Sequence, residues 1–311
     1  MSLDGGKAAT LRARSSAGRV ILTGVLVCCL TGCVSSSKSA REGNELADHP
    51  LSETEKTHTE DLPTLLSKGG NSLKLGKDDE ALYYFIKALD VQPGNLTALI
   101  SIGGIHQRKG NDDLAELAYR LAVKQHPKSV DALEGLGLVQ IRRNRPVEAR
   151  QQLTAALALD RRRWRSHNGI GLLDDQAGDH RSAQDHFRTA IGLDAKNPQL
   201  LVNLGYSLYL SRHWREAMQQ FDAALEIQPG LESAWLNKGL ILARQGEEKQ
   251  ALKAFGKVLS DADAWNNLGY IYMTQGESDR AGPCFERAIA LSPTYHAQAN
   301  ENLKRLNAMQ H

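Results

Sequence analysis

The sequence has few cysteines, few aromatic residues and no large excess of charge of one sign. Its four cysteines are Cys28, Cys29, Cys33 and Cys284, so three of them fall within the first 33 residues. This distribution excludes a disulfide framework, and Cys284 alone cannot build a metal site. Residues 1–32 hold four basic residues and one acidic residue, which leaves 34 basic and 35 acidic residues in the rest of the chain. Charge therefore gives no case for binding nucleic acid or an anionic membrane surface.

Long apolar runs are scarce as well, and the stretch from Val20 to Leu30 is too short to span a bilayer as a helix. Basic residues up to Arg19 precede this stretch, an order typical of a secretion signal. It ends in the tetrapeptide Leu-Thr-Gly-Cys, which resembles the lipobox of bacterial lipoproteins. The resemblance implies a cleaved signal peptide over residues 1–32 and a lipid on Cys33. The alternative is an ordinary signal peptide that happens to carry cysteines.

Residues 33–61 are polar. The segment is rich in serine from Ser35 to Ser39 and rich in acidic residues from Glu42 to Asp61. A composition of this kind cannot bury enough apolar surface to fold by itself. We therefore expect a flexible, solvated tether between the acylated cysteine and a folded body.

A glycine recurs at a constant interval along the rest of the chain. It falls at Gly69, Gly103, Gly137, Gly171, Gly205, Gly239 and Gly269, and the first five intervals are 34 residues while the last is 30. An alanine follows each glycine at Ala81, Ala115, Ala149, Ala183, Ala217, Ala251 and Ala281. A large residue follows at Phe85, Tyr119, Leu153, Phe187, Phe221, Phe255 and Phe285, and a small or branched one at Ala88, Ala122, Ala156, Ala190, Ala224, Val258 and Ala288. This frame resembles the tetratricopeptide repeat, a helix-turn-helix of 34 residues.

The resemblance implies an all-α solenoid of about seven such repeats over residues 62–295. The frame glycine lacks bulk, so we expect the two helices of a repeat to approach closely beside it. Five further glycines recur at the turn between the helices: Gly76, Gly110, Gly178, Gly246 and Gly276. Because the sixth repeat is four residues short, we expect a tighter turn between Val258 and Trp265.

Residues 296–311 follow the last repeat. Ala299, Leu303 and Leu306 share one helical face, and charged residues cover the rest. This pattern predicts a capping helix, which gives the end of a solenoid a polar outer surface.

No residue set in the sequence predicts catalysis, a metal site or a cofactor. The segment Gly70–Lys77 lacks the glycine spacing of a phosphate-binding loop, and Asp78 stands where a serine or threonine would hold magnesium. His180 and His186 are six residues apart, which places them on different faces of a helix. We therefore expect a non-enzymatic protein that needs no cofactor.

The densest charge is a cluster of seven arginines, which we call the arginine cluster. It consists of Arg142, Arg143, Arg145, Arg161, Arg162, Arg163 and Arg165. We expect it to form a solvated rim, and the alternative is docking of an acidic partner or of lipid headgroups. Predicted export and a near-neutral mature chain argue against nucleic acid.

In tetratricopeptide-repeat proteins, places two, five, nine, twelve and thirteen of each repeat face a concave groove. Carried over to repeats five to seven, the larger side chains at these places are Val202, Tyr206, Tyr209, Leu210, Leu236, Leu240, Arg244, Asn266, Tyr270 and Met273. The resemblance therefore implies a groove rich in apolar residues and tyrosine, although some of these tyrosines could instead pack against neighbouring helices.

Family members that bind chaperone tails hold a terminal carboxylate with a clamp of lysine, arginine and asparagine. The matching places here are Val202, Tyr206, Asn237, Asp263 and Asn267, so the cationic members are missing. We expect the ligand to be an apolar helix or extended segment held by side-chain burial.

Lipobox, tether and repeats together resemble the lipoproteins of pilus and secretion machines. The resemblance is strongest to the tight-adherence (Flp) pilus assembly lipoprotein and looser to the pilotins of type IV pili. It implies a protein-binding scaffold, anchored by lipid to the outer membrane and facing the periplasm, that assists assembly or localisation of a secretin. Val34 is not the aspartate associated with inner-membrane retention, which agrees with an outer-membrane location. The alternative is a scaffold that recruits periplasmic cell-wall hydrolases or proteases.

Overall fold

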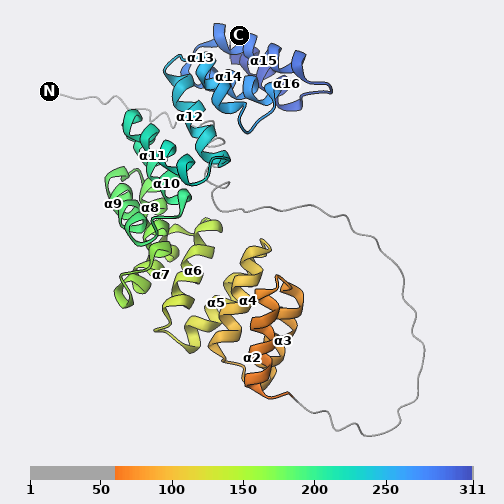
Figure 1. Ribbon diagram of the computed structural model, residues 1–311, viewed down its shortest axis with the longest axis vertical. Coiled ribbons are helices and arrows are strands. Elements are labelled where there is room, and N and C mark those ends of the chain that lie inside the picture. Colours follow the sequence, from red (N-terminus) through yellow and green to blue (C-terminus); the bar gives the residue numbers. More distant parts are fainter. Residues whose placement is uncertain (1–59, 310–311) are drawn as a thin grey trace, which may run out of the picture. The chain divides into compact units, whose positions relative to one another are not determined.

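The computed structural model describes residues 60–309, which form fifteen helices and, within that range, no strand (Figure 1). The predicted signal peptide, Cys33 and residues 33–59 of the predicted tether lie outside the described residues. None of the described helices is long and apolar enough to cross a bilayer. The predicted all-α class is confirmed.

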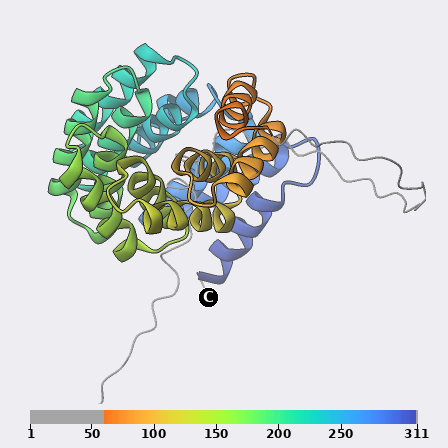
Figure 2. The ribbon, with the colours of Figure 1, turned by 90° about the horizontal axis from the view of Figure 1, so that it is seen from below.

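Fourteen of the helices form seven helix-turn-helix pairs, and α16 (Ala297–Met309) follows the last pair. The first helices of the pairs are α2 (Leu62–Lys74), α4 (Leu96–Arg108), α6 (Val130–Arg142), α8 (Trp164–Ala177), α10 (Pro198–Leu210), α12 (Glu232–Arg244) and α14 (Asp261–Gln275). The second helices are α3 (Asp78–Val91), α5 (Asp112–Gln125), α7 (Pro146–Leu159), α9 (His180–Leu193), α11 (Trp214–Ile227), α13 (Glu248–Phe255) and α15 (Ser278–Leu291). Each pair packs against the next in chain order, as the two ribbon views show (Figures 1 and 2). The arrangement is the predicted solenoid.

The turn inside each pair places one residue in the left-handed backbone region. The five predicted turn glycines, from Gly76 to Gly276, have φ between 71° and 86°. At the same place in the third and fifth pairs stand Asn144, with φ 55°, and Arg212, with φ 65°. The prediction that glycines occupy these turns is confirmed. At the other two turns, Asn144 and Arg212 adopt a left-handed conformation that is unfavourable for residues with a side chain.

The predicted close approach of the two helices of a repeat is confirmed. A Cβ atom at Gly205 would lie 2.6 Å from Cε1 of the buried Phe221, so only glycine fits without a shift. The other frame glycines face the large residue of their own second helix in the same way. Tyr119 also crowds Gly135 of the following repeat, where a Cβ would lie 2.4 Å from its ring. The large residue therefore packs both within its repeat and against the next one.

The sixth pair differs from our expectation. Its second helix, α13, has 8 residues, whereas α11 and α15 have 14 each. The loop to the next helix, residues 256–260, is no shorter than residues 228–231 after α11. The missing residues are thus lost from the helix, and the predicted tight turn between Val258 and Trp265 is wrong. Val258 lies beyond the helix end and is only half-buried, unlike the alanines at its place in other repeats.

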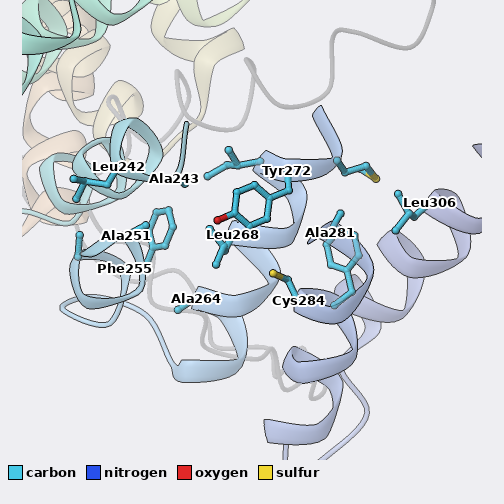
Figure 3. Close-up of a cluster of buried hydrophobic side chains, with 14 residues drawn as sticks. Leu242, Ala243, Ala251, Phe255, Ala264, Leu268, Tyr272, Ala281, Cys284 and Leu306 are labelled. Carbon is cyan, nitrogen blue, oxygen red and sulfur yellow. The ribbon is translucent and has the colours of Figure 1, made fainter. Parts of the chain in front are cut away.

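The C-terminal core joins α12 to α16. Figure 3 shows Phe255, Leu268, Tyr272, Cys284 and Leu306 among its buried side chains. In α16, Ala299 and Leu306 are buried and Leu303 packs partly against the same cluster, as predicted for the capping helix.

Candidate binding surface

Seven of the ten predicted groove residues are half-buried. These are Tyr206, Tyr209, Leu210, Leu236, Leu240, Arg244 and Tyr270, on α10, α12 and α14. The other three are buried: Val202 is 1% exposed, Asn266 3% and Met273 7%. Those three contribute to packing between helices and offer almost no surface to a partner.

Two tyrosines and one arginine connect successive first helices. The rings of Tyr206 and Tyr209 on α10 have centroids 5.9 Å apart with planes inclined by 32°. The guanidinium of Arg244 on α12 lies 5.6 Å from the centroid of the Tyr209 ring. Burial raises the pKa of Tyr209, so its hydroxyl stays protonated and available as a donor. We call these three residues the Tyr–Arg cluster.

Arg244 has unused hydrogen-bonding capacity in this cluster. Within residues 60–309, its buried Nε atom has no hydrogen-bond partner. A buried polar atom without a partner costs free energy, and a ligand on the surface cannot reach this one unless the side chain shifts. The Tyr–Arg cluster therefore combines half-buried rings with a cation, the side-chain types that are enriched in the centres of protein interfaces.

Polar side chains that the sequence reasoning missed join the first helices beside this surface. Asn203 Nδ2 on α10 donates to Asn168 Oδ1 on α8 over 2.7 Å. Asn302 Nδ2 on α16 donates to Asn266 Oδ1 on α14 over 2.9 Å. The first bond joins the fourth repeat to the fifth, and the second joins the seventh repeat to the capping helix. The sequence signal was the recurrence of asparagine on the first helices of repeats four to seven.

The asparagines considered for a carboxylate clamp do not form one. Asn237 is 3% exposed, and its Nδ2 donates to the carbonyl oxygen of Ser233 over 2.8 Å. Val202 and Tyr206 occupy two other clamp places, and neither carries a cation. The surface thus suits apolar and aromatic contacts better than a terminal carboxylate.

The arginine cluster is largely paired with acidic residues of the preceding repeat. Arg143 Nη1 lies 2.5 Å from one oxygen of Glu116, and Arg145 Nη1 lies 2.9 Å from the other. Arg142 pairs with Asp112. Glu116 is 1% exposed, so its carboxylate is a buried junction between the second and third repeats.

The remaining arginines divide into two groups. Arg163 Nη2 lies 2.9 Å from Glu134 Oε1, and Ser166 Oγ donates to the same carboxylate over 2.8 Å. Arg161, Arg162 and Arg165 are exposed. The expected solvated rim therefore describes only these three residues, and the other four bridge repeats.

The histidines have local partners. His180 Nδ1 lies 2.8 Å from Asp175 Oδ1, while His186 turns away from it and meets His167, with 3.1 Å between the two Nδ1 atoms. Burial lowers the pKa of His186. In the part of the chain that the structure describes, no group of three or more histidine, cysteine, aspartate or glutamate residues is placed to hold a metal ion.

The chain matches known proteins in its repeats and its fold. The tetratricopeptide repeat family matches residues 72–130, 114–163, 168–232, 232–260 and 262–295. A tetratricopeptide repeat protein from Parabacteroides merdae has a similar crystal structure, with a TM-score of 0.58 and 18% identity over 79% of this chain and 98% of that one. No curated protein matches the chain.

Two further solved structures are similar. One is the APC/C hetero-tetramer Cut9-Hcn1, with a TM-score of 0.58 and 16% identity over 79% of this chain and 52% of that one. The other is pilF of Pseudomonas aeruginosa, with a TM-score of 0.50 and 18% identity over 78% of this chain and 97% of that one. At such identities these likenesses show the fold alone. Tetratricopeptide-repeat proteins generally act as non-enzymatic scaffolds for other proteins. With its repeats matched over more than half of its length, the chain belongs to the tetratricopeptide-repeat family.

Proposed function

We propose that the chain is a lipid-anchored scaffold that binds another envelope protein on the first-helix surface of its fifth to seventh repeats. The Tyr–Arg cluster is the observation that supports this surface most. Tyr206, Tyr209 and Arg244 all remain half-buried after the repeats have packed. A few aromatic and arginine side chains of this kind usually dominate the free energy of binding at an interface.

The chemistry of the surface favours an apolar helix or extended segment as the ligand. Leu210, Leu236, Leu240 and Tyr270 extend the apolar character along α10, α12 and α14. A ligand of this kind would bury its apolar side chains here.

The lipobox supports a lipid on Cys33 and an outer-membrane location facing the periplasm. With the repeats, it supports the resemblance to pilus and secretion lipoproteins, so we propose a secretin or another pilus-assembly component as the partner.

Capture of the partner tests the binding surface. The full chain with a C-terminal affinity tag is expressed in its own cells, and proteins bound to it are identified from a detergent extract of the envelope. We expect secretin subunits, and retention should fall more than tenfold in a Tyr206→Ala, Tyr209→Ala and Tyr270→Ala triple variant, since each ring is worth on the order of 2 kcal/mol. Tyr295→Ala, which removes an exposed ring outside the surface, is the control and should bind as the wild type does.

Three results would decide against parts of the proposal. Wild-type retention by a triple variant with unchanged circular dichroism would place the ligand on another surface. Cell-wall hydrolases or proteases in place of secretin subunits would identify the recruiting scaffold instead. Metabolic labelling with a palmitate analogue should mark the wild type but not Cys33→Ser, and a labelled Cys33→Ser variant would refute the lipid anchor at that residue.

A further inference from the structure

Two second helices near the N-terminal end of the solenoid expose large apolar side chains. On α3, Tyr83 is 58% exposed and Ile86 is 51% exposed. On α5, Leu114, Leu117 and Leu121 are 48%, 53% and 41% exposed. We call these five residues the α3–α5 patch. It lies on second helices, whereas the surface of the proposed function lies on first helices.

The repeats themselves show that the fold does not require this patch. Tyr83 and Leu117 occupy the same place in the first and second repeats. The next four repeats have Gln151, Asp185, Gln219 and Lys253 there, and all four are exposed. The seventh repeat has Pro283, so a large apolar side chain stands at this place only in the first two repeats. Large apolar side chains that stay exposed without a packing role mark an interaction site.

The spacing on α5 suits a partner helix. Leu114, Leu117 and Leu121 are three and four residues apart, so they line one edge of the helix. An edge with this alternation of three and four is the seam by which two helices pack against each other.

Charge on the two helices disfavours a lipid surface as the occupant. The first turns are acidic, with Asp78, Asp79 and Glu80 on α3 and Asp112 and Asp113 on α5. Basic side chains are fewer and stand later in each helix: Lys87 on α3 and Arg120 and Lys124 on α5. The five carboxylates pair with Lys77, Arg108, Lys109, Arg142 and Arg143. Because Lys87 and Arg120 are also paired, the helices carry no surplus of basic charge of the kind that an anionic bilayer surface attracts.

The same charge order fits a second copy of the chain. When two α5 helices lie antiparallel, the acidic first turn of one meets the basic last turn of the other, and their helix dipoles oppose each other. Asp113 already pairs with Arg143 over 2.5 Å, yet its side chain is 84% exposed and has room for a second cation. Lys124 is exposed at the opposite end of the helix.

We propose that two copies of the chain associate through their α3–α5 patches, with the two α5 helices antiparallel about a two-fold axis near Leu117. In such a symmetric interface each patch meets an identical patch, so Leu117 of one copy lies close to Leu117 of its partner. The first-helix surfaces of both copies stay open to the scaffold's ligand.

Sedimentation equilibrium of the full chain in detergent tests the dimer. We expect a concentration-dependent dimer in the wild type. Leu117→Glu should raise its dissociation constant about tenfold or more, because two carboxylates would meet across the axis. Gln219→Glu makes the same charge change at the same place of the fifth repeat, and its dissociation constant should match that of the wild type. Circular dichroism of both variants establishes that they fold.

Crosslinking tests the geometry. Under mild oxidation Leu117→Cys should form a covalent dimer above the level of the wild type, and Gln219→Cys should not. A wild type that stays monomeric, or a folded Leu117→Glu variant that dimerises like the wild type, would overturn the proposal.

The lipid alternative has its own readout. In a Cys33→Ser background, so that no acyl chain contributes, the chain is sedimented with vesicles of phosphatidylethanolamine and phosphatidylglycerol. Vesicle binding that Leu117→Glu abolishes in an otherwise monomeric chain would assign the patch to the membrane and refute the dimer. Because the patch and the Tyr–Arg cluster are on different helices, failure of the dimer leaves capture of the scaffold's partner unaffected.

Discussion

A Cβ atom at Gly239 would lie 2.3 Å from Cε1 of Phe255, a shorter approach than at any other described glycine. Phe255 is 2% exposed and ends α13, so its ring has no free space to move into. We predict that Gly239→Ala lowers the free energy of unfolding by about 1–3 kcal/mol through overpacking. Gly192→Ala on α9 is the control, because nothing lies within 4 Å of its added Cβ. That variant should be as stable as the wild type or more stable by about 0.5–1 kcal/mol. If denaturant unfolding showed equal losses of stability for both variants, overpacking against Phe255 would not be the cause.

Arg212 adopts φ 65° at a turn where five other repeats have glycine. We predict that Arg212→Gly raises the free energy of unfolding by about 0.5–1 kcal/mol, since relief of the left-handed strain exceeds the added entropy of the unfolded chain. The reciprocal change, Gly246→Arg at the next turn, should lower it. Thermal melts compare the two variants, and a stabilising Gly246→Arg would show that the turn tolerates any residue.

Glu116 supports two arginines of the next repeat from a buried position. Glu116→Gln removes the charge that Arg143 and Arg145 share, and we predict a loss of about 1.5–3 kcal/mol in the free energy of unfolding. Asp185→Asn is the matched control. Its side chain is 69% exposed and pairs with Arg188 over 3.1 Å, so the loss should stay below about 1 kcal/mol. Similar small losses in chemical denaturation would mean that the buried junction contributes no more than a surface pair.

His186 should make the fold sensitive to acid. Burial lowers its pKa in the folded chain, although Asp174 nearby acts in the opposite direction. A lowered folded pKa means that the unfolded chain binds the proton more readily, so this stabilisation is present above about pH 6.5 and is lost as the pH falls through the folded pKa. We predict that Tm falls more from about pH 7 to about pH 5 in the wild type than in His186→Gln. Exposed His213, changed to Gln, should leave the wild-type slope intact, and parallel slopes for all three proteins would disprove the effect.

Cys284 should be unreactive in the folded chain. Burial raises the pKa of its thiol to about 12, and the residue is 4% exposed. Only the thiolate reacts readily with alkylating reagents. We expect iodoacetamide to modify Cys284 only after denaturant is added, and peptide mass spectrometry detects the modification. In an Asp279→Cys variant, the new cysteine is exposed and should react in the native chain. Equal labelling rates in the native chain would show that α15 opens frequently.

The repeat frame was predictable because its residues meet the same packing requirement in every repeat. A glycine such as Gly205 and a ring such as Phe221 must meet in the same narrow space in every repeat, so the pattern recurs in the sequence. The shortening of α13 was not predictable, because a deletion of four residues suits a helix end and a loop equally well. The structure shows that the residues are lost from the helix, and this outcome depends on packing between repeats.

The candidate surface was predictable only in part. Its places could be assigned from the frame, yet the burial of Val202 and Met273 depends on how far each repeat rotates against the next. The pairing of Glu116 with arginines of the following repeat depends on the same rotation. No residue pattern within one repeat carries that information.

The shortened α13 changes the helical phase at which the chain leaves the sixth repeat. The helix has 8 residues where α11 and α15 have 14, a loss of six residues or about one and two-thirds turns. The chain therefore leaves α13 on a different side from that of a full second helix. Residues 256–260 lead it to α14, and Leu259 among them packs against the C-terminal core. The stacking of the seventh repeat is thus maintained by the connecting segment and not by the length of the second helix.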